Sequence, residues 1–371
     1  MKKIRILLVG RSFYPRISPR SFRITEMAKE LARQGHEVVV YVVKDGFDYT
    51  SFEREYNLKV KDLGALWFKG IIIKGNRFSV LLRRIVKRAL AILIEYPDIE
   101  LAFKVSRALR CERGYDLMVS FAVPFPVHWG CAKVLIKNKD LCKVWVADCG
   151  DPYMGLKTDK FKKPFYFGFL EKWFCRKADY ITINGKELKG NYYPEFREKI
   201  RVIPQGFRFE DVVFSQVVEN KIPTFAYAGS FIKRIRDPRP FLNYLVTLER
   251  DFKFIVYTKD PGFLAGYADL LKGKLEVRSY IPRLELLNIL SSMDFLVTFD
   301  YNPRHQVPSK LIDYALTKRP ILSLSSENFS GEYFNEFLEH NYSHKFVVED
   351  IDQYNIKNVV NKFLALFAEK V

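Results

Sequence analysis

The residues best suited to chemistry lie at the start of one predicted helix in the second half of the chain. Pro308 opens a segment with helical spacing, directly after a strand-like apolar run and its loop. Ser309, Lys310 and Asp313 occupy its first turns. The N–H groups of a helix N-terminus and a lysine suit a phosphate, and an aspartate one turn later can accept hydrogen bonds from sugar hydroxyls. The alternative is an ordinary crossover helix with a solvated lysine.

A second candidate loop follows another strand-like run of the same half. Gly229 and Ser230 come first, and the cations Lys233, Arg234 and Arg236 follow within six residues. Free backbone N–H groups and nearby cations suit a diphosphate that is bound without a metal ion. Gly–Ser after a strand is also common loop chemistry.

The candidates of the first half lie in or beside loops at predicted strand ends. They are Arg16, Arg20, Arg23, His128, Asp148 and Asp151. The arginines suit a phosphate or are solvated loop residues. His128, beside Trp129 at a helix start, has either a direct or a structural role, and Asp148 can instead accept hydrogen bonds from neighbouring amides.

These loops need a scaffold of alternating strands and helices. Ile4–Gly10 is a continuous apolar run typical of a buried parallel strand, Phe22–Gln34 has the spacing of an amphipathic helix, and Val38–Val43 is the next strand. This Rossmann-like opening lacks G-x-G-x-x-G. The phosphate loop of a dinucleotide site is therefore absent, which disfavours a dehydrogenase.

The alternation predicts an α/β protein with two Rossmann-like domains. We expect an N-terminal, acceptor-side domain at 1–207, a linker at 208–223 and a C-terminal, nucleotide-sugar-binding domain at 224–350. A final helix at 351–371 can pack back toward the N-terminal domain. Strand ends that face one another would enclose a cleft.

Composition limits the partners of the chain. The net charge of +18 predicts attraction to an anionic partner, such as nucleic acid, anionic lipid or a phosphate-bearing substrate. No apolar run approaches the roughly 20 residues needed to span a bilayer. The five cysteines form no CxxC pair, so neither a disulfide framework nor a zinc site is expected.

One predicted helix concentrates this charge. Within Phe78–Ile94, Arg83, Arg84, Lys87 and Arg88 share one arc, and apolar residues fill the other. Such a helix can lie in a membrane interface, where each basic residue adds about 1 kcal/mol near anionic lipid. The alternative is a surface helix whose apolar face packs on its own domain.

Six segments in order resemble the GT-B-fold glycosyltransferases, in particular the retaining, family-4-like enzymes that use nucleotide sugars. The segments are RSFRITEMAKELARQGHEVVVYV (Arg20–Val42), VWVADCGDPY (Val144–Tyr153), ADYITIN (Ala178–Asn184), KIRVIPQGF (Lys199–Phe207), FAYAGSF (Phe225–Phe231) and QVPSKLIDYALTKRPIL (Gln306–Leu322). Together they cover the chain from one half to the other.

The resemblance implies a role for each candidate. Gly229, Ser230 and Arg236, with Lys233 and Arg234 as near alternatives, would hold the diphosphate. The helix start at Ser309, Lys310 and Leu311 would cap it, Asp313 would bind the ribose, and Tyr280 and Ile281 would lie against the base. Asp151, His128 and Lys310 would be the catalytic residues, and Arg16, Arg20, Arg23 and Asp148 would line the acceptor side.

The sequence departs from the family pattern in two places. The first glutamate of the E-x7-E pattern is absent, because His305 stands eight residues before Asp313. Its role toward the donor sugar passes to His305, Gln306 or Lys310, or is lost. Ser18-Pro19-Arg20 replaces the glycine pair of the first loop.

The expected function is transfer of a sugar from a nucleotide diphospho-sugar to a lipid-linked or membrane-proximal glycan in surface polysaccharide or lipopolysaccharide assembly. The resemblance implies retention of the anomeric configuration, no cofactor and no metal. The expected location is the cytoplasm, with peripheral association with the inner face of the membrane. A GT-B-fold nucleotide-sugar 2-epimerase is the first alternative, and a basic nucleic-acid-binding protein is less consistent because no binding motif is present.

Overall fold

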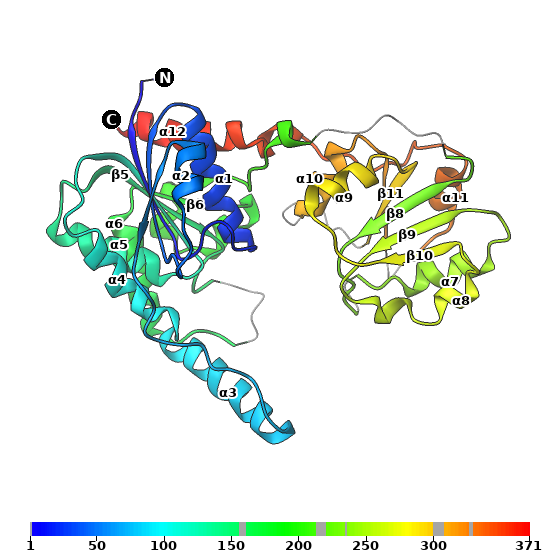
Figure 1. Ribbon diagram of the computed structural model, residues 1–371, viewed down its shortest axis with the longest axis horizontal. Helices are drawn as coiled ribbons and strands as arrows, with labels where there is room; N and C mark the ends of the chain where they lie inside the picture. Colours follow the sequence, from blue (N-terminus) through cyan, green and yellow to red (C-terminus); the bar gives the residue numbers. More distant parts are fainter. Residues whose placement is uncertain (1, 156–160, 213–219, 234–235, 300–307, 326–328) are drawn as a thin grey trace. The chain divides into compact units, whose positions relative to one another are not determined.

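The computed structural model describes residues 2–155, 161–212, 220–233, 236–299, 308–325 and 329–371. The chain forms two compact units, Met1–Phe207 with Gln353–Val371 and Arg208–Asp352 (Figure 1). Each unit is a parallel α/β layer structure, as the alternating sequence pattern predicts.

The first unit is built on a seven-stranded parallel sheet in the order β3-β2-β1-β4-β5-β6-β7. Its strands are β1 (Arg5–Val9), β2 (Glu37–Val42), β3 (Lys59–Asp62), β4 (Tyr115–Phe121), β5 (Cys142–Gly150), β6 (Tyr180–Ile183) and β7 (Ile200–Val202). Its α-helices are α1 (Pro19–Arg33), α2 (Thr50–Tyr56), α3 (Arg77–Ile94), α4 (Leu101–Ala108), α5 (Pro126–Lys137), α6 (Tyr166–Lys177) and α12 (Ile356–Lys370). The strand order reverses between β1 and β4, the point where doubly wound folds place ligands.

Successive side chains of β1 point to opposite faces of this sheet, and helices cover both faces. Leu7 packs in the core under α4, α5 and α6, whereas Leu8 packs in the core under α1, α2 and α12. The C-terminal helix α12 therefore completes the first unit, with Val360 and Phe363 beside the core residues of α1.

Helix α1 begins at Pro19, three residues earlier than the sequence pattern predicts. The hydroxyl of Ser18 accepts a hydrogen bond from the backbone N–H of Ser21 at 3.1 Å, and proline occupies the first helical position. This capped start is favourable because proline has no N–H to leave unpaired there. Arg20 consequently projects from a helix rather than from a loop.

The second unit contains a five-stranded parallel sheet in the order β10-β9-β8-β11-β12. Its strands are β8 (Thr224–Ala228), β9 (Lys253–Tyr257), β10 (Leu275–Arg278), β11 (Phe295–Phe299) and β12 (Ile321–Leu324). Its helices are α7 (Arg239–Thr247), α8 (Tyr267–Leu270), α9 (Arg283–Leu290), α10 (Ser309–Leu316) and α11 (Glu332–Leu338). Helices α7 and α11 cover one face of the sheet, and α9 and α10 cover the other.

Short 3-10 turns complete the described elements, at Asp98–Glu100, Lys186–Asn191, Pro194–Lys199, Phe209–Asp211, Pro261–Leu264 and Ile351–Tyr354. Within the described ranges, every helix is too short or too polar to cross a membrane. The same residues hold no group of three metal-binding side chains.

Candidate functional site

A pocket opens in the second unit at the carboxyl ends of β8 and β9. Its volume is about 290 Å³. It is lined by Ala228, Gly229, Ser230, Tyr257, Thr258, Lys259, Tyr280, Ile281, Leu286, Leu290, Lys310, Asp313 and Tyr314. Six of the predicted nucleotide-sugar residues thus meet in one pocket, beside the point where the strand order reverses between β8 and β11.

Tyr314 holds α10 against the end of β8. Its hydroxyl accepts a hydrogen bond from the backbone N–H of Ala228 at 2.7 Å, inside the core. Gly229 follows with φ near 152°, and a Cβ there would lie 3.0 Å from the hydroxyl of Tyr227. A larger residue would therefore crowd the loop that faces α10.

Lys310 enters this pocket from the first turn of α10. Its Nζ lies 4.7 Å from the centroid of the Tyr227 ring, in a cation–π arrangement. Burial raises the pKa of the Tyr227 hydroxyl to about 12, so the ring stays neutral and the lysine is the cation at this wall. A cation held at a strand end beside a helix N-terminus suits a diphosphate.

Leu311 does not take the role that the resemblance implies. Its side chain is fully buried, and its backbone N–H donates to the carbonyl of Pro308 at 2.9 Å. The N–H group of Leu311 is thus already used and cannot cap a diphosphate in this structure.

Asp313 lines the pocket one turn after Lys310 and is held by Arg283. Nε and Nη2 of Arg283 both donate to Oδ1, at 2.9 and 2.5 Å. Among the described residues none donates to Oδ2, which leaves that oxygen for a ligand hydroxyl. Burial raises the pKa of Asp313, and Arg283 opposes that rise.

Tyr280 forms an exposed ring at the edge of the pocket. Its side chain is 57 % exposed, and Lys259 Nζ lies 4.5 Å from the ring centroid. An exposed aromatic ring of this kind can stack with a planar base.

Lys233 and Arg236 lie farther along the loop that begins at Gly229, outside the residues that line the pocket. Paired backbone hydrogen bonds between Ile232 and Arg236, at 3.2 and 2.7 Å, close that loop. Arg234, His305 and Gln306 lie outside the described residues, as does the side chain of Ser309.

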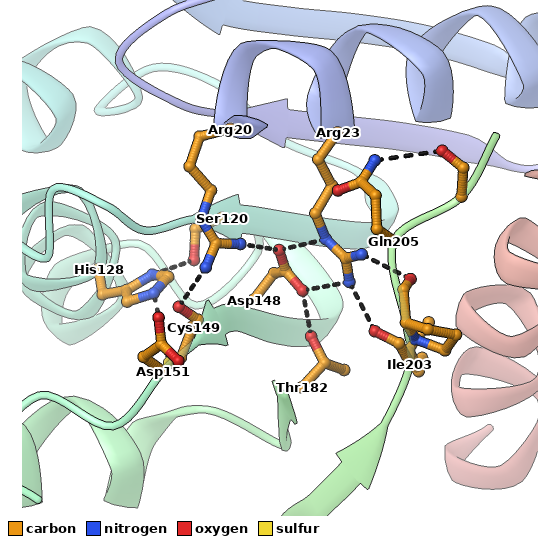
Figure 2. Close-up of polar contacts among 12 residues, drawn as sticks. Arg20, Arg23, Ser120, His128, Asp148, Cys149, Asp151, Thr182, Ile203 and Gln205 are labelled. Carbon is orange, nitrogen blue, oxygen red and sulfur yellow. Dashed lines mark hydrogen bonds and ion pairs between the residues drawn. The ribbon is translucent and has the colours of Figure 1, made fainter. Parts of the chain in front are cut away.

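In the first unit, Arg23 and Asp148 form a buried ion pair rather than a substrate-facing wall (Figure 2). Arg23 is 2 % exposed and Asp148 is fully buried. Nε and Nη2 of Arg23 donate to Oδ2 and Oδ1 of Asp148, both at 2.7 Å, and the hydroxyl of Thr182 donates to Oδ1 at 2.6 Å. Every position around the carboxylate is thus taken by protein, which corrects the acceptor-side assignment of both residues.

This ion pair joins four segments of the first unit. Besides Asp148, Arg23 donates to the backbone carbonyls of Ile203 and Pro204 at 3.0 and 2.7 Å. Burial on its own would raise the pKa of Asp148, but Arg23, Arg20 and Thr182 hold it below its usual value. The pair therefore connects α1, β5, β6 and the segment after β7.

His128 is also structural in this position. It is fully buried, its Nδ1 lies 2.8 Å from the hydroxyl of Ser120, and its Nε2 lies 3.5 Å from Sγ of Cys149. Burial lowers its pKa to about 3, so the imidazole is neutral. A buried neutral histidine does not contact substrate, which corrects its assignment as a catalytic residue.

Arg20 and Asp151 remain at the open side of the same strand end. Arg20 donates to the carbonyl of Cys149 at 2.8 Å and to Asp148 at 3.3 Å, with 18 % of its side chain exposed. Asp151 is exposed just beyond Gly150. Arg16 lies farther along the loop and pairs with Asp45.

Two charged residues at this site were not predicted from the sequence: Lys259, which lines the pocket, and Arg283, which binds Asp313 from outside the lining. Lys259 lies two residues beyond the end of β9 at Tyr257, and its place at a strand end could have identified it. Arg283 gives no comparable signal, since it stands 30 residues from its partner Asp313.

Solved structures with this architecture include a glycosyltransferase from Rickettsia africae (12 % identity, TM-score 0.64, 100 % of this chain and 99 % of that one). Another is the apo form of the lipopolysaccharide outer core galactosyltransferase WaaB (12 % identity, TM-score 0.57, 99 % of this chain and 100 % of that one). A UDP-GlcNAc 2-epimerase from Methanocaldococcus jannaschii is also similar (11 % identity, TM-score 0.52, 98 % of this chain and 99 % of that one). At these identities the likeness shows the fold.

A search of curated protein sequences gave no match. The family model described as Glycosyltransferase Family 4 matches residues 22–210, just over half of the 371-residue chain. The expected GT-B fold is confirmed, and the chain belongs to Glycosyltransferase Family 4.

Proposed function

We propose that this glycosyltransferase takes its sugar from a nucleotide diphospho-sugar bound in the pocket of the second unit. The observation that carries the proposal is the meeting of Lys310, Asp313 and Tyr280 in one pocket at the carboxyl edge of the sheet. A cation, a hydrogen-bond acceptor and an exposed ring match the diphosphate, the ribose and the base in turn.

In this reaction the protein must stabilise the nucleoside diphosphate that leaves. Lys310 and the N-terminal turn of α10 supply positive potential where negative charge develops as the sugar leaves. No metal ion is required for this role. Retention of the anomeric configuration is part of the proposal and rests on the family resemblance.

We further propose that the acceptor is a lipid-linked or membrane-proximal glycan and that α3 holds the enzyme at the inner face of an anionic membrane. No side chain of α3 is buried, and Figure 1 shows the helix extending from the rest of its unit. Phe78, Leu81 and Ile85 are 75, 56 and 56 % exposed, so this part of the apolar face does not pack on its own domain. Exposed apolar surface beside one-signed charge favours an interfacial helix.

The exposed apolar surface continues beyond α3. Phe161, Phe165 and Phe169 are 63, 79 and 69 % exposed, and Arg88 lies 5.8 Å from the ring centroid of Phe161. The fold likeness to a lipopolysaccharide galactosyltransferase fits a role in surface polysaccharide or lipopolysaccharide assembly.

A thermal-shift series with UDP-, GDP-, ADP- and dTDP-sugars tests the donor proposal. We expect one nucleotide series to raise the melting temperature of the wild type, and Lys310→Ala to reduce that rise. If no sugar nucleotide changes the melting temperature, the donor proposal is wrong.

Co-sedimentation with anionic vesicles tests the membrane proposal. Replacing Arg83, Arg84, Lys87 and Arg88 together by serine should release the protein, at up to about 1 kcal/mol for each lost charge. Substitution of Lys139 and Lys186, which are exposed like the four residues of α3, is the matched control and should leave sedimentation unchanged. Equal sedimentation of the quadruple variant and the wild type would contradict the proposal.

The second candidate is a nucleotide-sugar 2-epimerase, favoured by the likeness to the archaeal enzyme. Such an enzyme needs a donor pocket but neither an acceptor nor a membrane. Incubating the protein with its sugar nucleotide alone separates the two functions by NMR. Accumulation of the free 2-epimer would replace the transferase proposal.

A further inference from the structure

The first unit contains a polar pocket where the C-terminal end of α3 joins the domain. Its volume is about 210 Å³, and its lining residues are Arg88, Ala91, Ile92, Glu95, Tyr96, Asp98 and Lys163. None of the first-half residues assigned from the sequence to the acceptor side belongs to it. We refer to it as the α3 pocket.

Two contacts place the α3 pocket at the carboxyl edge of the first sheet. Arg11, two residues beyond β1, brings its Nε to 3.0 Å from Oδ1 of Asp98. Tyr153, three residues beyond β5, donates its hydroxyl to Oε1 of Glu95 at 2.9 Å. The pocket thus lies beside the loops at the end of the sheet where folds of this type bind ligands.

The two carboxylates of the α3 pocket each keep one oxygen available. Tyr153 and Lys163 both bind Oε1 of Glu95, and Arg11 lies against Oδ1 of Asp98. Among the described residues, none donates a hydrogen bond to Oε2 of Glu95 or to Oδ2 of Asp98. Both carboxylates can therefore accept hydrogen bonds from a ligand.

The charges of the lining select the class of ligand. Among the described lining residues, Glu95 and Asp98 are acidic and Arg88 and Lys163 are basic, so the formal charges of this lining cancel. A phosphate would face two carboxylates, and a metal cation would face two cations. A neutral polyhydroxyl compound fits better, because each of its hydroxyls can donate a hydrogen bond to a carboxylate oxygen.

The position of the α3 pocket indicates which polyhydroxyl compound would reach it. Arg88, Ala91 and Ile92 belong to the last turns of α3, the exposed helix with a basic arc and an apolar face. A glycan that is anchored in a bilayer beside α3 would bring its sugars to this end of the helix.

We infer that the α3 pocket binds one sugar ring of the membrane-borne acceptor, with Glu95 and Asp98 accepting hydrogen bonds from its hydroxyls. The inference rests on the proposed transferase function and places the acceptor away from the buried Arg23–Asp148 pair.

Saturation-transfer-difference NMR with methyl glycosides tests the inference. The probes are the methyl α- and β-glycosides of glucose, galactose, mannose and N-acetylglucosamine. At least one should show saturation transfer from the wild type, and Asp98→Asn and Glu95→Gln should each weaken its binding about tenfold or more. Glu187→Gln, an exposed carboxylate elsewhere in the unit, is the matched control and should bind as the wild type does.

Ala91→Phe gives an independent test that removes no polar group. The residue lies on the exposed helix α3, so a larger side chain is tolerated by the fold while it fills the pocket. Glycoside binding should be lost, whereas nucleotide-dependent thermal shifts and vesicle binding should stay at wild-type levels. The inference is overturned if no probe binds the wild type or if Ala91→Phe binds glycosides normally. If the donor proposal fails instead, no sugar nucleotide will change the melting temperature of any variant.

Discussion

Each unit holds an aspartate bound by an arginine near its strand ends, and the two pairs differ in what remains available. Asp148 in the first unit is fully buried and is bound through both oxygens by Arg23, with Thr182 and Arg20 added (Figure 2). Asp313 in the second unit lines a pocket, and Arg283 binds only its Oδ1.

This difference separates a structural carboxylate from a ligand-binding one. A carboxylate whose oxygens are all hydrogen-bonded to protein groups cannot accept a further hydrogen bond from a substrate. Breaking its ion pair leaves an uncompensated buried charge. A carboxylate with one oxygen satisfied is oriented and still able to accept a hydrogen bond.

The largest effect should follow from Asp148→Asn. It leaves the buried guanidinium of Arg23 without its counter-charge, and we expect a loss of about 3–5 kcal/mol in the free energy of unfolding. Urea unfolding measures it, with Asp313→Asn as the control, which should lose about 1 kcal/mol or less because its pair is partly solvated. Similar losses for both variants would remove the distinction.

The same pair predicts a pH dependence of stability. Because the pKa of Asp148 is lower in the folded protein than the unfolded value of about 3.9, its contribution is complete above that value. The contribution is lost as the pH falls from there toward the folded pKa. The stability difference between wild type and Asp148→Asn should therefore shrink in acid and stay constant from pH 6 to pH 8.

Lys310→Ala should affect turnover rather than stability. Removing one group that stabilises charge in the transition state typically lowers the rate by about 10²–10³-fold. His128→Gln is the informative comparison, because the buried His128 has no contact with substrate and should change stability more than kcat. Near-normal turnover of Lys310→Ala would remove its role toward the diphosphate.

Arg283→Met should weaken nucleotide binding in a pH-dependent way. Without the guanidinium, burial raises the pKa of Asp313 further, so the carboxylate protonates at a higher pH. Titration calorimetry with a nucleoside diphosphate should show a loss of about tenfold at pH 5.5 and a smaller loss at pH 8. A pH-independent loss would mean that Arg283 acts through contact alone, and Arg283→Lys should restore part of the low-pH affinity.

The parts of the fold that follow local patterns were predictable from the sequence. The strand–helix alternation located both sheets, and proline at the start of α10 identified the helix that carries Lys310 and Asp313. Local pattern also predicted α3 to within one residue of its observed start at Arg77.

The errors concern contacts between residues that are distant along the chain. Arg23 and Asp148 are separated by 125 positions, so nothing in either neighbourhood reveals that each completes the other. Both were expected to face substrate because arginine and aspartate near strand ends do so in many sites. Arg283 was missed for the same reason, and Leu311 because helix periodicity does not show which N–H group is already bonded.

The central claim is that the pocket of the second unit holds the donor nucleotide through Asp313, whereas Asp148 stabilises the fold. Calorimetric titration of UDP, GDP, ADP and dTDP into the wild type, Asp313→Asn and Asp148→Asn tests this claim most directly. The predicted result is one nucleotide that binds the wild type, binds Asp313→Asn about tenfold or more weakly, and binds the folded fraction of Asp148→Asn normally. Unchanged affinity in Asp313→Asn, or loss of affinity only in Asp148→Asn, would contradict the claim.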